Sequence, residues 1–279
     1  MTPDPMDPRP ESKPLVSIVT PTFNSARFLE ETLACIVGQT YRNIEHIVVD
    51  GGSTDGTLAI LHKQAHFRWL SEPDDGMYDA INKGLRMAAG SIVAYLNSDD
   101  LYFDDTVQRV VDFFEKNREA ELVYSDLLYI DENMQPLFVR KYPPFSWKMF
   151  AILDGSIVPQ QTCFWRRRVL EASGYFDKSF KMAGDFEFLV RVGKVHHVRK
   201  LPGRPLAQFR FHEGMLTLNR NEINKEEIER IHKMYGFPQS PHNRILKMAA
   251  ALRYKMWNLH RVKDKTMNLL SGNKMKYNP

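Results

Sequence analysis

The sequence is short of cysteine and of long apolar runs. Its 279 residues include two cysteines, Cys35 and Cys163, which are too few for a disulfide framework and match no metal-binding spacing. We interpret both as small buried thiols in a reducing compartment. No stretch approaches the roughly 20 apolar residues that span a bilayer. These absences predict a soluble protein that needs neither disulfides nor a membrane-spanning helix.

The amino terminus also lacks the apolar core of a secretory signal peptide. Residues 1–13 are polar and hold four prolines, so we expect a disordered leader. The predicted location is therefore the cytoplasm. The remaining composition is that of an ordinary globular domain, with 43% hydrophobic and 26% charged residues.

Charge is distributed unevenly along the chain. The net charge is +4, but residues 241–279 alone carry +8 and the other residues carry −4. Apolar residues recur at helical spacing from Ile245 to Leu259, which predicts a basic amphipathic helix. Two contacts are open for it: an anionic membrane surface at the inner face of the membrane, through residues 243–265, or the body of the protein. Nucleic acid is not an expected partner, because no recognition motif accompanies the charge.

Strand and helix patterns alternate through the first half of the sequence. Buried strands are expected at residues 15–19, 44–49, 67–70, 92–96 and 122–124. The helices that separate them are expected near residues 25–37, 54–64, 77–89 and 104–116. This alternation predicts a mostly parallel sheet flanked by helices, with ligands bound beyond the carboxyl ends of the strands.

The second half is less regular. A hairpin is expected over residues 127–139, and two further strands at 195–201 and 206–211. The expected helices lie near residues 167–172, 185–192 and 222–234.

Two adjacent carboxylates follow the strand expected at residues 92–96, in the segment Asn97-Ser98-Asp99-Asp100. Like charges side by side destabilise a fold unless a cation or hydrogen-bond donors offset them. A hard divalent ion, held by carboxylates and substrate phosphates, would do so. The alternative is a solvated turn in which Asp100 caps the next helix.

Two further polar turns follow strands or begin helices. Asp50 and the glycines after it allow a tight turn, where a carboxylate can accept hydrogen bonds from a nucleobase N–H or a ribose hydroxyl. This segment is neither a phosphate loop nor a dinucleotide fingerprint, and a plain glycine turn is the alternative. The acidic turn that includes Asp75 begins a helix, on which Asp79, Asn82 and Lys83 form a polar stripe at spacings i, i+3 and i+4.

Taken in order, these motifs are far more specific than any one alone. Thr-Pro-Thr-Phe-Asn ends the first strand and Val-Val-Asp-Gly-Gly-Ser-Thr-Asp-Gly-Thr ends the second. Asp-Asp-Gly-Met-Tyr-Asp-Ala-Ile-Asn-Lys-Gly and Leu-Asn-Ser-Asp-Asp follow. In this order and spacing, about residues 14–212 resemble the family 2 glycosyltransferases. The resemblance implies the GT-A fold, an α/β fold with a mostly parallel central sheet flanked by helices.

The resemblance also implies a division of the chain. Residues 14–215 would form the catalytic domain, with a nucleotide-sugar-binding half over 14–126 and an acceptor-side half over 127–215. Residues 216–279 would be a helical, basic, amphipathic extension.

Roles for donor-side residues come from the same resemblance. Asp50 would hold the base of the nucleotide, and Thr20, Pro21 and Thr22 would line the same pocket. The family's Asp-x-Asp-type motif falls on the segment that begins at Asn97. There Asp100 would bind Mn²⁺ or Mg²⁺, and Asp99 would contact ribose or sugar hydroxyls.

The rest of the expected donor site lies on the acidic turn and the helix after it. Asp75, Asp79 and Lys83 belong to it, as does Asn97. Many members have an arginine at the position of Ile81, and Lys83 would supply that charge instead.

On the acceptor side, Asp185 matches the aspartate that serves as the family's catalytic base. Gly184 stands where relatives often have glutamate, and Asp185 could equally be a helix N-cap. Gln161 would contact the donor sugar or the acceptor, beside a Gln160 that replaces the histidine of relatives. Arg191 would aid the diphosphate or pair with an acid. His212 would contact the diphosphate or the metal, or be a surface histidine.

The implied reaction transfers one sugar from a nucleotide-diphosphate sugar to an acceptor hydroxyl, with inversion at the anomeric carbon. A saccharide or a lipid-linked acceptor is expected, as in polysaccharide, lipopolysaccharide or glycolipid synthesis. Two alternatives stay open. One is a non-catalytic member that only binds a sugar nucleotide or a partner. The other is a nucleotidyltransferase, although residues 20–25 lack the glycine- and arginine-rich loop with a lysine that such enzymes usually have.

Overall fold

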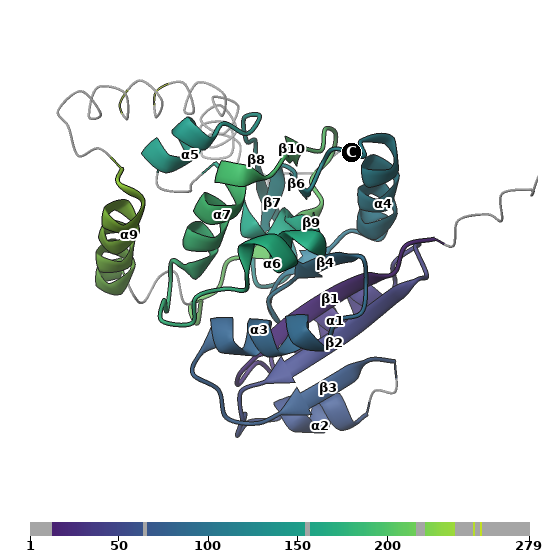
Figure 1. Ribbon diagram of the computed structural model, residues 1–279. Helices are drawn as coiled ribbons and strands as arrows, with labels where there is room; N and C mark the ends of the chain where they lie inside the picture. The colour runs from purple at the N-terminus through teal and green to yellow at the C-terminus, as the bar shows by residue number, and fades with distance from the viewer. Residues whose placement is uncertain are drawn as a thin grey trace, which may run out of the picture.

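The computed structural model describes residues 13–63, 66–153, 157–215 and 221–237, together with Met248 and Leu252. A seven-stranded sheet runs through the molecule in the order β10-β6-β9-β4-β1-β2-β3 (Figure 1). Its strands are β1 (Val16–Thr22), β2 (Ile44–Asp50), β3 (Arg68–Ser71), β4 (Ile92–Tyr95), β6 (Leu122–Tyr124), β9 (Phe164–Arg166) and β10 (Val198–Lys200). Only β9 runs antiparallel to its neighbours in this sheet, which confirms the predicted mostly parallel sheet.

Helices cover both faces of the sheet. They are α1 (Leu29–Val37), α2 (Thr57–His62), α3 (Met77–Met87), α4 (Thr106–Lys116), α5 (Trp147–Ile152), α6 (Arg168–Ser173), α7 (Gly184–Val195) and α9 (Asn221–Tyr235). Alternate side chains of β2 point to opposite faces, as they must in a strand. Val48 packs with residues of α1 and α2, whereas Ile47 and Val49 pack in the main core with residues of α3.

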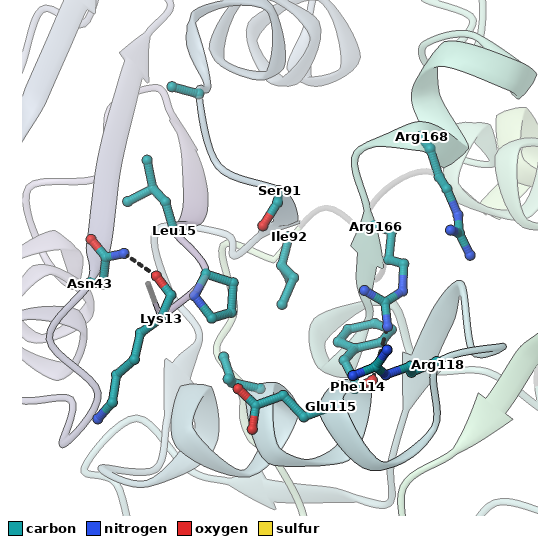
Figure 2. A pocket seen from close by; sticks show the side chains of 13 residues that line it. Lys13, Leu15, Asn43, Ser91, Ile92, Phe114, Glu115, Arg118, Arg166 and Arg168 are labelled. Atoms are coloured by element: carbon teal, nitrogen blue, oxygen red, sulfur yellow. Dashed lines mark hydrogen bonds between the residues drawn. The ribbon is translucent and has the colours of Figure 1, made fainter. Parts of the chain in front are cut away.

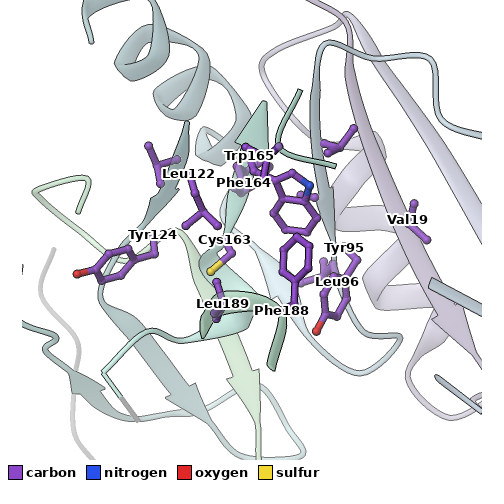
Figure 3. Close-up of a cluster of buried hydrophobic side chains, with 14 of the residues drawn as sticks. Val19, Tyr95, Leu96, Leu122, Tyr124, Cys163, Phe164, Trp165, Phe188 and Leu189 are labelled. Atoms are coloured by element: carbon purple, nitrogen blue, oxygen red, sulfur yellow. The ribbon is translucent and has the colours of Figure 1, made fainter. Parts of the chain in front are cut away.

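Large aromatic side chains join β9 and α7 to the middle of the sheet (Figure 3). Trp165 of β9 is in ring contact with Tyr95 of β4, at 6.4 Å between centroids, and with Phe188 of α7, at 5.5 Å. All three side chains are buried. Since aromatic side chains bury large apolar areas, this cluster fixes β9 and α7 against β4.

A second sheet stands beside the carboxyl end of β4. Its order is β5-β11-β7-β8, with β5 (Leu101–Tyr102), β7 (Leu127–Ile130), β8 (Pro136–Arg140) and β11 (Ala207–Arg210). β11 pairs antiparallel with β5, with Gln208 opposite Leu101. This pairing brings the residues after β11 next to Asp99 and Asp100, which directly precede β5.

Most elements lie where the sequence predicts them. The hairpin is present as β7 and β8, and the expected helix over 222–234 is α9. The prediction missed β5, α5, β9 and the 3₁₀ turn η1 (Gln160–Thr162), all of them too short to show a periodic pattern. The leader up to residue 12 and nearly all of the basic segment 243–265 lie outside the described residues. None of the helices in the described ranges is long and apolar enough to cross a bilayer.

Candidate functional site

The polar residues that follow strands β1, β2 and β4 lie at one edge of the sheet. Strands β1 and β2 are parallel and end together, with Thr22 opposite Asp50. Strand β4 runs parallel to β1 on its other side, with Tyr95 opposite Val19, so that Asn97 to Asp100 leave the sheet at the same edge. Carboxyl ends of parallel strands are where open α/β sheets bind ligands.

Asp50 organises its own turn. The side chain is 0% exposed, and its Oδ2 accepts hydrogen bonds from the N–H groups of Gly52 (3.1 Å) and Ser53 (3.0 Å) and from the Ser71 hydroxyl (2.7 Å). Gly52 has φ +84°, a conformation that glycine adopts without strain. Its other oxygen, Oδ1, accepts the Ser53 hydroxyl. None of these contacts tests the base contact expected of Asp50, which stays a prediction.

The residues at the end of β1 divide into buried and exposed ones. Thr20 is fully buried and its hydroxyl lies 2.9 Å from Nε2 of His46, so its expected place in the nucleotide pocket stays a prediction. Pro21 and Thr22 are buried too, and the Thr22 hydroxyl has no hydrogen-bond partner among the described residues. The next residue, Phe23, is 61% exposed. Because Phe23 belongs to the Thr-Pro-Thr-Phe-Asn motif, the sequence could have indicated it as a candidate site residue.

The two carboxylates of the Asn97–Asp100 turn have different surroundings. Asp100 is buried, and its Oδ1 accepts the N–H of Arg210 at 3.2 Å. Burial and the neighbouring Asp99 charge raise the pKa of Asp100 well above its ordinary value. Asp99 is partly exposed and its Oδ2 lies 2.9 Å from Nε2 of His212. Asp99 is thus the more accessible of the two carboxylates, and the metal-ligand role expected of Asp100 and His212 stays a prediction.

The structure also decides whether Asp100 caps a helix and whether His212 is a free surface residue. Asp100 does not cap the next helix, since α4 begins after Asp105. His212 is not an unattached surface residue: besides Asp99, it contacts the ring of Phe28, with centroids 4.7 Å apart.

Arg210 holds this turn from behind. Its side chain is 0% exposed, and its guanidinium donates to the carbonyl oxygens of Asp99 and Glu132, each at 3.0 Å, and to the carboxylate of Glu31. The guanidinium also stacks over Phe28, 4.5 Å from the ring centroid. The sequence argument missed Arg210, although a cation within a largely apolar strand was a usable signal.

Asp185 lies in the first turn of α7. Ala183 occupies the N-cap position, so the N-cap alternative for Asp185 is wrong. Oδ1 accepts the N–H of Phe186 at 2.8 Å and lies 3.3 Å from the Tyr78 hydroxyl. Burial raises the pKa of Asp185, and the charge of Glu227 raises it further, while these hydrogen bonds lower it. A carboxylate with a raised pKa is a stronger base.

Tyr78 explains the glycine that departs from the family pattern. A Cβ on Gly184 would lie 2.7 to 2.9 Å from three ring carbons of Tyr78, so no side chain fits there. The Tyr78 hydroxyl also accepts the N–H of Asp185 at 3.1 Å. Helix α3 therefore contacts the start of α7 through Tyr78. This tyrosine lies in the Asp-Asp-Gly-Met-Tyr motif, but the sequence alone suggested no role for it.

Asp185 and Asp100 both act on one side chain at the end of β4. The pKa of Tyr95 is raised well above its ordinary value by burial, then by the charge of Asp185 and, to a smaller extent, by that of Asp100. The Tyr95 ring also contacts the ring of Phe176, with centroids 5.5 Å apart, and Phe176 stacks on Tyr78, whose hydroxyl lies 3.3 Å from Oδ1 of Asp185. A series of ring contacts thus connects the end of β4, which leads into the Asn97–Asp100 turn, to Asp185.

Two glutamines follow Pro159 in η1. Gln160 is buried and donates to the carbonyl of Tyr95 at 3.1 Å, which makes it a structural residue. Gln161 is half-buried, so its side chain is still available for a substrate contact.

Arg191 does not serve the diphosphate. Its guanidinium binds Glu187, with Nη2 2.9 Å from Oε2, and the carbonyls of Ser173 and Tyr175. Of the two expectations for Arg191, the structure shows the ion pair with an acid, Glu187.

The acidic turn before α3 belongs to a network of ion pairs. Lys83 lies 2.8 Å from Glu72 and 3.6 Å from Asp79. Lys178 reaches across from the acceptor-side half to Asp75, at 2.6 Å, and to Asp79, at 3.6 Å. The charges of Asp75, Asp79 and Lys83 are thus offset within the protein, and the network ties the two halves together.

A hollow of about 820 Å³ lies elsewhere (Figure 2). It is bordered by Leu15 and Ile92, at the amino ends of β1 and β4, and by Arg118 and Arg166. It therefore opens at the opposite edge of the sheet from Asp50 and Asp99 and is separate from the candidate site.

The sheet, the polar turns at its carboxyl edge and the partly buried aspartate of α7 define an α/β protein built to bind a ligand at that edge. Residues 17–173 match the family model described as glycosyl transferase family 2. The chain belongs to this glycosyltransferase family.

Curated relatives agree with the family. The chain is 34% identical over 192 residues to an uncharacterised glycosyltransferase of Mycobacterium tuberculosis, which covers 66% of this chain and 71% of the relative. It is 32% identical over 188 residues to a PGL/p-HBAD biosynthesis glycosyltransferase of Mycobacterium bovis, covering 64% and 69%.

Solved structures show the GT-A glycosyltransferase fold. TarS of S. aureus, residues 1–349 in complex with UDP-GlcNAc, superposes with a TM-score of 0.65 at 20% identity and covers 82% of this chain and 69% of that one. The match spans 42% of the longer TarS chain. The mannosyltransferase PcManGT of Pyrobaculum calidifontis, in complex with GDP-Man and Mn²⁺, has a TM-score of 0.62 at 21% identity and covers 98% and 80%.

Proposed function

We propose that this glycosyltransferase moves one sugar from a nucleotide-diphosphate sugar to an acceptor hydroxyl with inversion, using Asp185 as the base. The observation that carries the proposal is that β4 leads into one acidic turn and is connected to a second acidic group through the rings of Tyr95, Phe176 and Tyr78. The turn contains the partly exposed Asp99, and the second group is Asp185, whose pKa is raised by burial.

Asp99 and His212 are the residues that would hold a divalent ion. A carboxylate oxygen and an imidazole nitrogen suit Mn²⁺. Oδ1 of Asn97 supports the fit, because it is buried with no hydrogen-bond partner among the described residues. No group of three or more acidic, histidine or cysteine side chains that could hold a metal is found in the described ranges. Diphosphate oxygens would complete the ligand set, and the bound ion would offset the charge of the leaving diphosphate.

Asp185 would perform the proton transfer. No side chain of the described residues donates to its Oδ2, so this oxygen is available to the acceptor hydroxyl. As the hydroxyl oxygen bonds to the anomeric carbon, its proton moves to Asp185 and the bond from that carbon to the diphosphate oxygen breaks. The nucleoside diphosphate leaves with the electron pair. A single displacement of this kind inverts the anomeric configuration.

The donor base would lie over the turn at Asp50. Phe23 presents an exposed ring one residue after Thr22, which pairs with Asp50 in the sheet. Aromatic rings stack on nucleobases. The bound UDP-GlcNAc and GDP-Man of the related structures support a sugar nucleotide as donor.

For the acceptor, we favour a lipid-linked saccharide or glycolipid over a free sugar. The support is the relative of M. bovis that carries PGL/p-HBAD biosynthesis in its name. Binding of residues 243–265 to an anionic membrane from the cytoplasmic side remains part of the proposal and lies outside the described residues.

The test is a transfer assay with purified protein. UDP- and GDP-sugars are offered with Mn²⁺ and with glycolipid or saccharide acceptors, and the anomeric configuration of the product is read by NMR. Transfer with inversion, lost in excess chelator and restored by Mn²⁺ or Mg²⁺, is the expected result. Retention of configuration would remove Asp185 from the base role, and full turnover in chelator would remove the metal.

A further inference from the structure

Helix α9 lies beyond the segment that matches the family model, yet it is packed along α7 (Figure 1). Ile231 of α9 is fully buried in the main core. The Tyr235 hydroxyl donates to Oε1 of Glu187 at 2.5 Å, and the rings of His232 and Phe186 are 6.4 Å apart. These contacts place α9 against the helix whose first turn contains Asp185.

Glu227 of α9 binds the backbone just before α7. Its Oε1 accepts the N–H of Lys181 at 2.6 Å, and its Oε2 accepts the N–H groups of Met182 and Ala183, both at 2.8 Å. The side chain is 8% exposed. In the described part of the chain, no lysine or arginine lies within ion-pair distance of it. Three backbone N–H groups at the start of a helix are therefore what stabilises this buried charge.

The hydrogen bonds of Glu227 to the backbone of residues 181–183 also set the position of Asp185. Ala183 is the N-cap of α7, and Asp185 comes two residues later. Without Glu227, three N–H groups would face a buried space with no acceptor, which a folded chain avoids by moving them. A shift of this backbone moves Asp185 with it, and displacements of about 1 Å can cost 10²-fold in rate.

Building on the function proposed above, we infer that Glu227 is a positioning residue for sugar transfer, which makes α9 part of the catalytic apparatus. It acts through the backbone of Lys181, Met182 and Ala183, and it need not touch either substrate. The donor site at Asp50 and Asp99 is built from other elements and does not depend on it.

The charge of Glu227 gives this inference a second readout. The groups that act on Asp185 are Tyr78 from α3, which lowers its pKa by a hydrogen bond, and Glu227 from α9, which raises it. Tyr95 of β4 and Cys163 also lie within reach of the Asp185 charge. Removing the charge of Glu227 therefore lowers the pKa of Asp185.

The experiment compares Glu227→Gln with Glu226→Gln and Glu229→Gln, two exposed glutamates of the same helix. Glutamine keeps one acceptor oxygen but turns an amide N–H₂ toward backbone N–H groups. We expect Glu227→Gln to lower kcat by about 10- to 100-fold, with donor affinity within about twofold of wild type. The acid limb of its pH profile should move to lower pH, and amide exchange at residues 181–186 should be faster. Both controls should behave like wild type.

A second variant, Glu227→Asp, keeps the charge on a shorter side chain and should recover part of kcat. The inference is overturned if Glu227→Gln matches the controls in kcat, or if kcat falls while exchange at 181–186 and the pH profile do not change. Loss of donor binding together with kcat would equally overturn it, because it would indicate general unfolding. Absence of transfer by the wild-type protein would contradict the proposed function instead, and amide exchange would still decide whether Glu227 orders this backbone.

Discussion

Asp50 and Asp185 are both enclosed carboxylates of the candidate site, but different kinds of contact hold them. Asp50 takes hydrogen bonds from Gly52 and Ser53, two and three residues along the chain, and from Ser71. Asp185 is approached by Tyr78, which is 107 residues away, and the backbone before it is held by Glu227, more than 40 residues later. The donor-side acid is thus set mainly by its own turn, and the acceptor-side acid by distant parts of the chain.

This difference has a consequence for how the two sides tolerate change. A turn that supplies its own donors keeps its shape as long as its short segment is intact. A residue held from two distant helices depends on the packing of α3, α7 and α9 together. We therefore expect variants far from Asp185 in sequence to alter catalysis while leaving donor binding unchanged.

The largest predicted effect is at Asp185 itself. Asp185→Asn removes the proton acceptor and should lower kcat by about 10²- to 10⁴-fold, the usual contribution of a positioned base. Donor binding, measured by calorimetry, should stay within about twofold because the donor turns are on other elements. Glu171→Gln, at an exposed glutamate of α6, is the matched control. Normal turnover by Asp185→Asn would contradict the base assignment.

The same contrast explains what the sequence could reveal. Turns such as Asp50–Ser53 and Asn97–Asp100 consist of consecutive residues that directly follow predicted strands. Their place at the sheet edge was therefore predictable from the order of strands and helices. The difference in burial between Asp99 and Asp100 was not, because Asp100 is covered by residues such as Arg210, 110 residues later. The contacts of Arg191 with the carbonyls of Ser173 and Tyr175, and the enclosure of Thr20 by His46, depend likewise on residues outside their own elements.

Removing Arg210 tests whether the Asn97–Asp100 turn keeps its shape without contacts from distant parts of the chain. The ion pair of Arg210 with Glu31 contributes little, because that carboxylate is 41% exposed. Arg210→Met also leaves the carbonyl oxygens of Asp99 and Glu132 without their donor, and leaving a buried acceptor unsatisfied costs about 1–3 kcal/mol. The free energy of unfolding, from urea denaturation, should fall by this amount. Arg199→Met, at an exposed arginine, should change it by less than about 0.5 kcal/mol. A loss for Arg210→Met no larger than for the control would show that the turn supports itself.

A third prediction separates the two carboxylates of the turn. Asp99→Asn should weaken the apparent affinity for Mn²⁺ in the transfer assay by at least about 10-fold, which is the lower end of the effect of losing even an outer partner of a metal ligand. Excess Mn²⁺ should restore part of the rate, and the stability of the metal-free protein should be close to wild type. Glu132→Gln serves as a nearby acidic control, because only its backbone carbonyl contacts Arg210. An unchanged Mn²⁺ requirement in Asp99→Asn would contradict its assignment as a ligand.

The smallest predicted effect is at Tyr78, and its sign is informative. The Tyr78 hydroxyl lowers the pKa of Asp185, so Tyr78→Phe should raise that pKa further and move the acid limb of kcat/KM to higher pH. A hydrogen bond contributes about 0.5–1.5 kcal/mol net, and 1.36 kcal/mol corresponds to one pKa unit, so the shift should be about one pH unit or less. Tyr175→Phe, at a tyrosine that packs on Arg86, is the control and should leave the profile in place. Because Glu227→Gln is expected to move the same limb in the opposite direction, shifts of opposite sign in the two variants would show that α3 and α9 act on one carboxylate. A shift of the same sign in both would mean that the two helices act on different groups.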